Sequence, residues 1–156
     1  MQEKETTIRE DLSVVPSEGR VIAIDPGTKR IGVAVCDERR IAVRPLPIVE
    51  RTSWKKLLIK IRDILTEFDA VGLVVGLPYN FDGTESEMSS EARKLARNFA
   101  LSLDIPVFLQ DERATTYEAR GKLWSRGATD VELAKTLDSE AAAIILSDFL
   151  GRASAS

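Results

Sequence analysis

The sequence of 156 residues contains no histidine and only one cysteine. Histidine is the commonest general base near neutral pH and the commonest zinc ligand, so its absence removes both roles. A single cysteine cannot form a disulfide within the chain, and we expect Cys36 to pack as a small core residue in a reducing cytoplasm. Any catalytic chemistry must therefore use carboxylates, hydroxyls, lysine, arginine or a hard metal ion.

Long apolar segments are also missing. No run approaches the roughly 20 residues of a transmembrane helix, so no membrane association is expected. Residues 1–19 are charged and polar and do not resemble a secretory leader, which favours a cytoplasmic protein. The length suits one domain, and a composition that is 44% hydrophobic supports a core. We expect a flexible polar tail at 1–19, a single domain at 20–150 and a C-terminal tail at 151–156.

The net charge of −3 argues against strong nucleic-acid binding by the chain as a whole. Its distribution is uneven, because residues 1–20 hold five acidic and three basic groups. The stretch 113–126 holds four basic groups and one acidic group. Two interpretations remain open for that stretch, a nucleic-acid-binding surface and an ordinary solvated helix face.

Hydrophobic patterning predicts an α/β fold. An apolar run followed by a short Pro-Gly turn indicates an antiparallel hairpin, and an unbroken apolar run at 70–77 indicates a central parallel strand. Apolar residues at helical spacing follow Trp54, and Pro45 and Pro47 place the third strand at a sheet edge. The expected strands are 20–25, 30–36, 41–49, 70–77 and 106–109. The expected helices begin near 54, at the Ser/Thr-x-x-Glu capping motifs of Thr84, Thr115 and Thr129, and the last ends near Leu150.

This order of elements, three antiparallel strands followed by βαβ units, predicts a mixed five-stranded sheet flanked by helices. Three carboxylates stand at the ends of these elements. Asp25 ends the first strand, Glu112 closely follows the last strand, and Asp138 lies near the start of the last helix. Asp138 precedes Ala142 by four residues and Ile145 by seven, so it shares the apolar stripe of that helix. An ionised group on such a stripe is costly unless something pairs with it.

Carboxyl ends of parallel strands gather functional groups at one edge of a sheet. If the strands of Asp25 and Glu112 are neighbours, the three acids converge. Three carboxylates without histidine suit Mg²⁺ or Mn²⁺, and two such ions about 3.5–4 Å apart activate a water and stabilise the leaving oxygen of a phosphodiester. Each acid also has a plain structural alternative: Asp25 as a turn cap, Glu112 as a partner of Arg113, and Asp138 as a helix cap.

Four separated motifs carry a resemblance to a known family. The segments AIDPGTKRIGVAVCDE, VVGLPYNFDGTES, IPVFLQDERATTYEA and LDSEAAAIILSDFL resemble, in that order, the Holliday-junction-resolvase-like YqgF family over about residues 20–150. The resemblance implies a ribonuclease H-like fold and a nuclease that processes the ends of 16S ribosomal RNA precursor. It also implies that Asp25, Glu112 and Asp138 are the catalytic, metal-binding acids.

The same matching places Lys29, Arg30, Asn80 and Arg113 on polar motif positions of the family. Together with Lys122 and Arg126 they form the expected nucleic-acid face. The sequence departs from the family before its last acidic motif, where GATDVELAKTL has a single lysine in place of a basic stretch. Because phosphate neutralisation supplies much of nucleic-acid affinity, weak and salt-sensitive binding is expected.

Other functions remain open. The Asp-Pro-Gly-Thr hairpin also resembles the phosphate loop of the actin and sugar-kinase superfamily, although those proteins clamp a nucleotide between two such domains. A Holliday-junction resolvase acting on DNA and a non-catalytic RNA-binding or ribosome-assembly module are further alternatives. The expected partners are structured RNA, branched DNA or ribosomal precursor particles, and a monomer and a homodimer are both compatible with the sequence.

Overall fold

A computed structural model describes residues 8–9, 14–27, 29–78, 87–111 and 130–155, with the side chains of the last range described from 139 to 153. Within these ranges a five-stranded sheet has the order β3-β2-β1-β4-β5. The strands are β1 (Val21–Pro26), β2 (Arg30–Cys36), β3 (Val43–Glu50), β4 (Gly72–Leu77) and β5 (Val107–Asp111). The helices are α1 (Trp54–Glu67), α2 (Glu87–Ser102) and α4 (Asp130–Ala155).

The sheet is mixed, as the sequence predicts. β1 and β2 pair antiparallel, as do β2 and β3, whereas β4 runs parallel to both β1 and β5. β3, which contains Pro45 and Pro47, is an edge strand. Proline has no backbone N–H to donate, and an edge strand tolerates this because it has a neighbouring strand on one side only. β4 is central and buried along its whole length, as expected for a strand covered on both faces.

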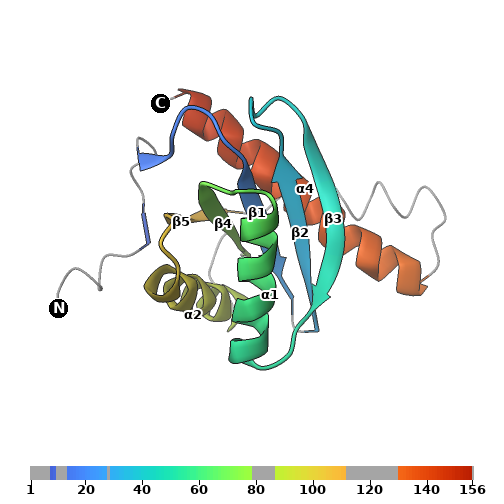
Figure 1. Ribbon diagram of the computed structural model, residues 1–156. Coiled ribbons are helices and arrows are strands. Elements are labelled where there is room, and N and C mark those ends of the chain that lie inside the picture. The colour runs from blue at the N-terminus through green and yellow to red at the C-terminus, as the bar shows by residue number, and fades with distance from the viewer. Residues whose placement is uncertain (1–7, 10–13, 28, 79–86, 112–129, 156) are drawn as a thin grey trace.

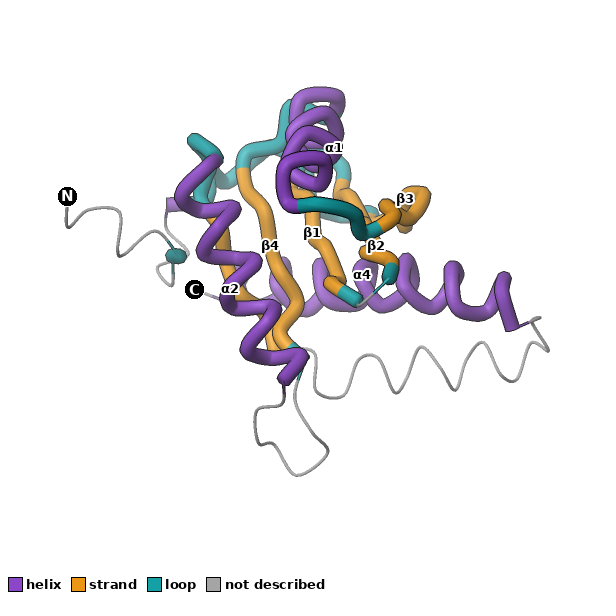
Figure 2. Tube along the Cα trace, turned by 90° about the horizontal axis from the view of Figure 1, so that it is seen from below, coloured by secondary structure: helices purple, strands orange, loops and turns teal. Residues whose placement is uncertain are grey.

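The molecule has three layers, with α1 and α2 over one face of the sheet and α4 across the other (Figures 1 and 2). The alternation of side chains along β1 separates two core clusters. Ile22 and Ile24 pack in the cluster that contains residues of α1 and α2, such as Phe99. Val21 and Ala23 pack in the cluster that contains residues of α4. The face on which a β1 side chain lies therefore follows from whether its number is odd or even.

Helix α1 shows how local sequence sets an element. Ser53 is its N-cap, and the hydroxyl oxygen accepts a hydrogen bond from the backbone N–H of Lys56 at 3.3 Å. A serine at this position satisfies one of the donors that a helix start leaves without an intrahelical partner. Leu57, Ile61 and Leu65 then form the buried stripe of the helix.

The predicted end of the last helix is wrong. Helix α4 continues past Leu150 to Ala155, so residues 151–155 are helical rather than a tail. Gly151 does not stop the helix because the residues beyond it have contacts of their own. Ala153 packs against the α4 core cluster, and Nη2 of Arg152 donates to the carbonyl oxygen of Leu109 at 3.2 Å.

Parts of the segment predicted to be a flexible N-terminal tail contact the rest of the fold. Ile8 forms a β-bridge with Val107, and the backbone N–H of Arg9 donates to the Val107 carbonyl at 2.8 Å. Val15 is buried in the α4 core cluster. Apolar side chains in an otherwise charged segment supply the anchoring. The capping motifs of Thr84, Thr115 and Thr129 lie outside the described residues.

Candidate active site

Asp25 is the penultimate residue of β1 and, in this fully described strand, the one residue that is not buried. The four preceding residues of the strand, from Val21 to Ile24, are fully buried, whereas Asp25 is partly exposed. It pairs with Gly32 of β2, and the preceding Ile24 pairs with Val75 of β4. Asp25 shares the odd-numbered face of β1 with Val21, which is the face that α4 covers. The strand therefore presents a carboxylate to the edge of the sheet beneath α4.

The carboxyl ends of β1, β4 and β5 lie at one edge because the three strands are parallel. Leu77 pairs with Asp111 at this edge, and Glu112 is the next residue after Asp111. The sequence left open whether the strands of Asp25 and Glu112 are neighbours. They are not, since β4 lies between β1 and β5. Two strand spacings, roughly 10 Å, separate the backbones of β1 and β5.

Helix α4 crosses the sheet from the other side and contacts β1, β2 and β3. Its buried Ser139 donates a hydrogen bond from Oγ to the Leu46 carbonyl of β3 at 2.8 Å. This bond fixes the helix on the sheet at the residue that follows Asp138. The predicted apolar stripe of this helix is confirmed at Ala142 and Ile145, which are fully buried.

The turn between β1 and β2 is tight. The backbone N–H of Gly27 donates to the Arg30 carbonyl at 3.0 Å, and a Cβ added at Gly27 would lie 2.6 Å from that oxygen. Lys29 is exposed and Arg30 is partly buried. Arg30 has the same parity along β2 as the α4-facing Ala34, so it lies on the same face of the sheet as Asp25. The shared face is compatible with the predicted cation near this acid, and the role of Arg30 stays a prediction.

Sequence reasoning missed Arg51, which directly follows β3. Its Nη1 donates to the Gly27 carbonyl at 2.8 Å, its backbone N–H donates to the Lys29 carbonyl at 2.9 Å, and its Nη2 lies 3.7 Å from Oε1 of Glu91. Arg51 thus connects the β1–β2 turn to helix α2. No local signal could have identified it, because its role depends on the pairing of β2 with β3.

Sequence reasoning also missed Ser89. This residue is fully buried near the start of α2, and its hydroxyl donates to the carbonyl oxygen of Pro78 just after β4. A buried hydroxyl is stable only when it is hydrogen-bonded. The bond joins the start of α2 to the carboxyl end of β4, so the same edge of the sheet is held by Ser89 and by Arg51.

The other predicted site residues are not described. Glu112, Asn80, Arg113, Lys122 and Arg126 lie outside the described residues, as does the side chain of Asp138. Among the side chains that the structure does describe, no group of three His, Cys, Asp or Glu could hold a metal ion. The convergence of the three acids therefore remains a prediction. No helix in the described part of the chain is long and apolar enough to cross a membrane.

Comparison with known proteins gives a consistent result. The profile of the RuvX family, described as Holliday junction resolvase, matches residues 19–152. A protein of Cereibacter sphaeroides named "Putative pre-16S rRNA nuclease" is 37% identical over 94% of this chain and 91% of its own length. A protein of the same name from Novosphingobium aromaticivorans is 40% identical over 82% of each chain.

Solved structures support the fold. RuvC of Thermus thermophilus in complex with a Holliday junction substrate has a TM-score of 0.53 at 18% identity, covering 85% of this chain and 95% of that one. A second structure of Thermus thermophilus RuvC has a TM-score of 0.50 at 17% identity, with the same coverage. The family that the four sequence motifs predict is confirmed: the chain belongs to the RuvX family of Holliday junction resolvases and has the ribonuclease H-like fold.

Proposed function

We propose that this protein is a metal-dependent nuclease that hydrolyses phosphodiester bonds in 16S ribosomal RNA precursor. The observation that carries the proposal is Asp25, a partly exposed carboxylate at the end of a buried central strand, in a chain of the RuvX family. The names of the relatives support the RNA substrate. The nuclease domain would begin near residue 20 and include helix α4 to Ala155, in a cytoplasmic protein.

The proposed catalytic and metal-binding residues are Asp25, Glu112 and Asp138. Asp25 fits a hard ion such as Mg²⁺ or Mn²⁺, because it offers carboxylate oxygens at an accessible strand end of a chain without histidine. Bound there, such an ion would lower the pKa of a water and stabilise the charge that develops on the phosphate. Glu112 and Asp138 are proposed from their places in the sequence and from the family resemblance.

The basic residues of this edge would bind the substrate backbone. Arg30 shares the α4-facing side of the sheet with Asp25, and Lys29 is exposed in the adjoining turn. Arginine offers a planar set of donors that matches phosphate, whereas lysine offers a point charge. Arg51 would hold the turn that carries both, through its bond to the Gly27 carbonyl. The other residues proposed for this face are Asn80, Arg113, Lys122 and Arg126.

A second candidate function is cleavage of branched DNA. The family description and the likeness to RuvC favour it, although at 18% identity the likeness concerns the fold alone. Binding of ribosomal precursor without cleavage is a third candidate. All three functions would use the same edge of the sheet, so the position of the site does not distinguish them. A cleavage assay with two substrates does.

The test is incubation of the purified protein with precursor 16S ribosomal RNA and, separately, with a four-way DNA junction, each with Mn²⁺ and with EDTA. We expect Mn²⁺-dependent cleavage of the RNA by the wild type and none by Asp25→Asn, which keeps the shape of the side chain but removes its charge. Cleavage of the junction alone would favour the resolvase. Equal cleavage by Asp25→Asn would contradict the proposed site, and binding without cleavage would favour the third function.

A further inference from the structure

A cleft lies at the outer edge of the sheet, beside β5. Its volume is about 410 Å³, and its lining comes from the N-terminal segment, β4, α2, β5 and the end of α4. Among the described residues, the polar side chains that line it are Arg9, Arg93, Gln110, Asp111 and Arg152. None of the three arginines belongs to the set proposed above for the nucleic-acid face.

The described residues of the cleft carry more positive than negative charge. Three arginines and one acid, Asp111, are among them, whereas the whole chain carries a net charge of −3. The arginines come from positions 9, 93 and 152, so only the folded chain gathers them. A cluster of guanidinium groups in a cleft matches the geometry of phosphate oxygens, which accept paired hydrogen bonds.

Contacts with the core position two of these arginines. The backbone N–H of Arg9 donates to the Val107 carbonyl at 2.8 Å, which places the N-terminal segment along β5. Nη2 of Arg152 donates to the Leu109 carbonyl at 3.2 Å, and the guanidinium carbon lies 5.4 Å from the centre of the Phe149 ring. Arg93 is partly buried on α2. The three cations are therefore brought to β5 from three sides.

Gln110 adds a polar group that is poorly satisfied. Its Oε1 is buried and has no hydrogen-bond partner among the described residues, and its Nε2 donates only a long bond of 3.4 Å to the Asp111 carbonyl. Most buried side-chain amides have better partners. The amide is therefore suited to rearrange toward a polar ligand, and a half-turn of its terminal torsion exchanges donor and acceptor.

We propose that this cleft binds a phosphate group of the nucleic-acid substrate, an inference that rests on the proposed function. The cleft adjoins the active edge, since Asp111, the last residue of β5, pairs with Leu77 at the end of β4. Two strand spacings, roughly 10 Å, separate β5 from β1 and Asp25. A nucleic-acid strand spans this distance with a few nucleotides. The phosphate is either an internal phosphodiester of the strand or the phosphate at its 5′ end.

The test measures binding in EDTA, where metal-dependent cleavage is absent. A 3′-labelled single-stranded RNA is titrated with wild type, Arg9→Ala and Arg152→Ala at several salt concentrations. We expect each variant to weaken binding and to flatten the slope of log affinity against log salt by about 0.7, the value for one lost phosphate contact on a single strand. The matched control is Arg97→Ala, an exposed arginine of the same helix as Arg93 that does not line the cleft.

The two phosphate sources are separated by repeating the titration with 5′-phosphorylated and 5′-hydroxyl RNA. A loss confined to the phosphorylated RNA assigns the cleft to the terminal phosphate, and an equal loss with both assigns it to an internal one. Slopes of Arg9→Ala and Arg152→Ala that match Arg97→Ala would overturn the proposal. If Arg152→Ala is unstable, Arg9→Ala still decides the test. The side chain of Arg9 is exposed, and the alanine variant keeps the backbone hydrogen bond to Val107.

The outcome is separable from that of the proposed function. In EDTA, Asp25→Asn should bind the RNA at least as tightly as wild type, because it removes one negative charge, while it no longer cleaves. A wild type that binds through Arg9 and Arg152 but never cleaves would contradict the nuclease function and leave the cleft as a binding site. A wild type that cleaves, with unaltered binding by both arginine variants, would contradict the cleft alone.

Discussion

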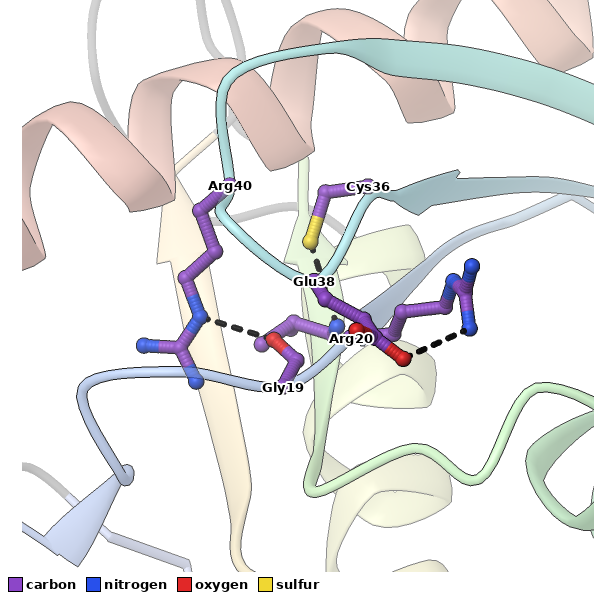
Figure 3. Close-up of polar contacts among 6 residues, drawn as sticks. Gly19, Arg20, Cys36, Glu38 and Arg40 are labelled. Atoms are coloured by element: carbon purple, nitrogen blue, oxygen red, sulfur yellow. Dashed lines mark hydrogen bonds and ion pairs between the residues drawn. The ribbon is translucent and has the colours of Figure 1, made fainter.

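The two ends of β1 differ in how their polar groups are used. At the amino end, the segment before β1 meets the turn between β2 and β3, and Figure 3 shows the contacts. Nε of Arg40 donates to the Gly19 carbonyl at 2.9 Å, and Nη1 of Arg20 lies 3.6 Å from Oε1 of Glu38. The backbone N–H of Val21 donates to Sγ of Cys36 at 3.2 Å. All the contacts drawn there are made between residues of the chain itself.

At the carboxyl end, Asp25 stands beside a tight turn, with Arg30 on the same face. Arg51 and Ser89 hold the surrounding backbone from outside the strand. Under the proposed function, the amino end of this strand contributes to stability and its carboxyl end to catalysis. Substitutions at the amino end should change the free energy of unfolding and spare cleavage, whereas substitutions at the carboxyl end should reduce cleavage by more than any loss of stability explains. The following predictions test this division, beginning with the largest effect.

Asp25→Asn should abolish the thermal stabilisation by Mn²⁺ together with cleavage. A ligand that binds the native state at 100 times its Kd stabilises it by about 2.7 kcal/mol, and the variant loses that gain. In EDTA the variant should be as stable as wild type or slightly more stable, because repulsion among the proposed acids is reduced. Thermal scans with and without Mn²⁺ measure both effects. If millimolar Mn²⁺ does not change the melting temperature of the wild type, that result would count against the metal site.

Gly27→Ala should damage the active edge directly. The added Cβ would lie 2.6 Å from the Arg30 carbonyl, so the turn must open, at a cost of about 1–3 kcal/mol. Because the turn follows Asp25 closely, cleavage should fall by more than the loss of stability explains. The control is Gly151→Ala in α4, where nothing lies within 4 Å and stability should rise by about 0.5–1 kcal/mol. Equal activity of the two variants would show that the turn does not position the site.

Asp37→Asn should affect stability without affecting cleavage. Hydrogen bonds from backbone N–H groups, chiefly that of Ile41 at 2.8 Å, lower the pKa of the Asp37 carboxyl below its ordinary value of 3.8. A lowered native pKa stabilises the fold above the ordinary value and loses this contribution as the pH falls through the native value. The variant should thus be less stable than wild type at neutral pH. The difference should vanish in acid, and urea unfolding across pH measures it.

Cys36→Ala should leave cleavage unchanged and destabilise the fold by about 1–3 kcal/mol at neutral pH, because it removes a buried sulfur atom and leaves the buried Val21 N–H without its acceptor. Burial raises the pKa of this thiol above its ordinary value of 9.0, so the native state resists ionisation. Wild type should therefore lose stability relative to the variant as the pH rises above 9. Denaturant unfolding at neutral and alkaline pH measures the trend. A change in the cleavage rate of Cys36→Ala would contradict the proposal that the amino end of β1 affects stability and not cleavage.

The part of the fold that depends on local pattern was predictable. The predicted boundaries of β1 and β2 lie within one residue of the observed ones, because apolar runs and a Pro-Gly turn mark them. The end of α4 was not predictable, because the helix continues past Gly151 on contacts made by Arg152 and Ala153 with distant residues. The order of the strands, with β4 between β1 and β5, is likewise a matter of packing.

The sequence by itself determined the family, the five strands and the acid near the end of β1, because each is encoded in a short stretch of residues. Tertiary structure alone decided that Arg51 supports the Gly27 turn and that Arg9, Arg93 and Arg152 line one cleft. Such groupings join residues far apart in the chain, and no local period or motif records them. They arise because the sheet and its covering helices bring distant backbones together, and hydrogen bonds and charges then act across the short distances that result.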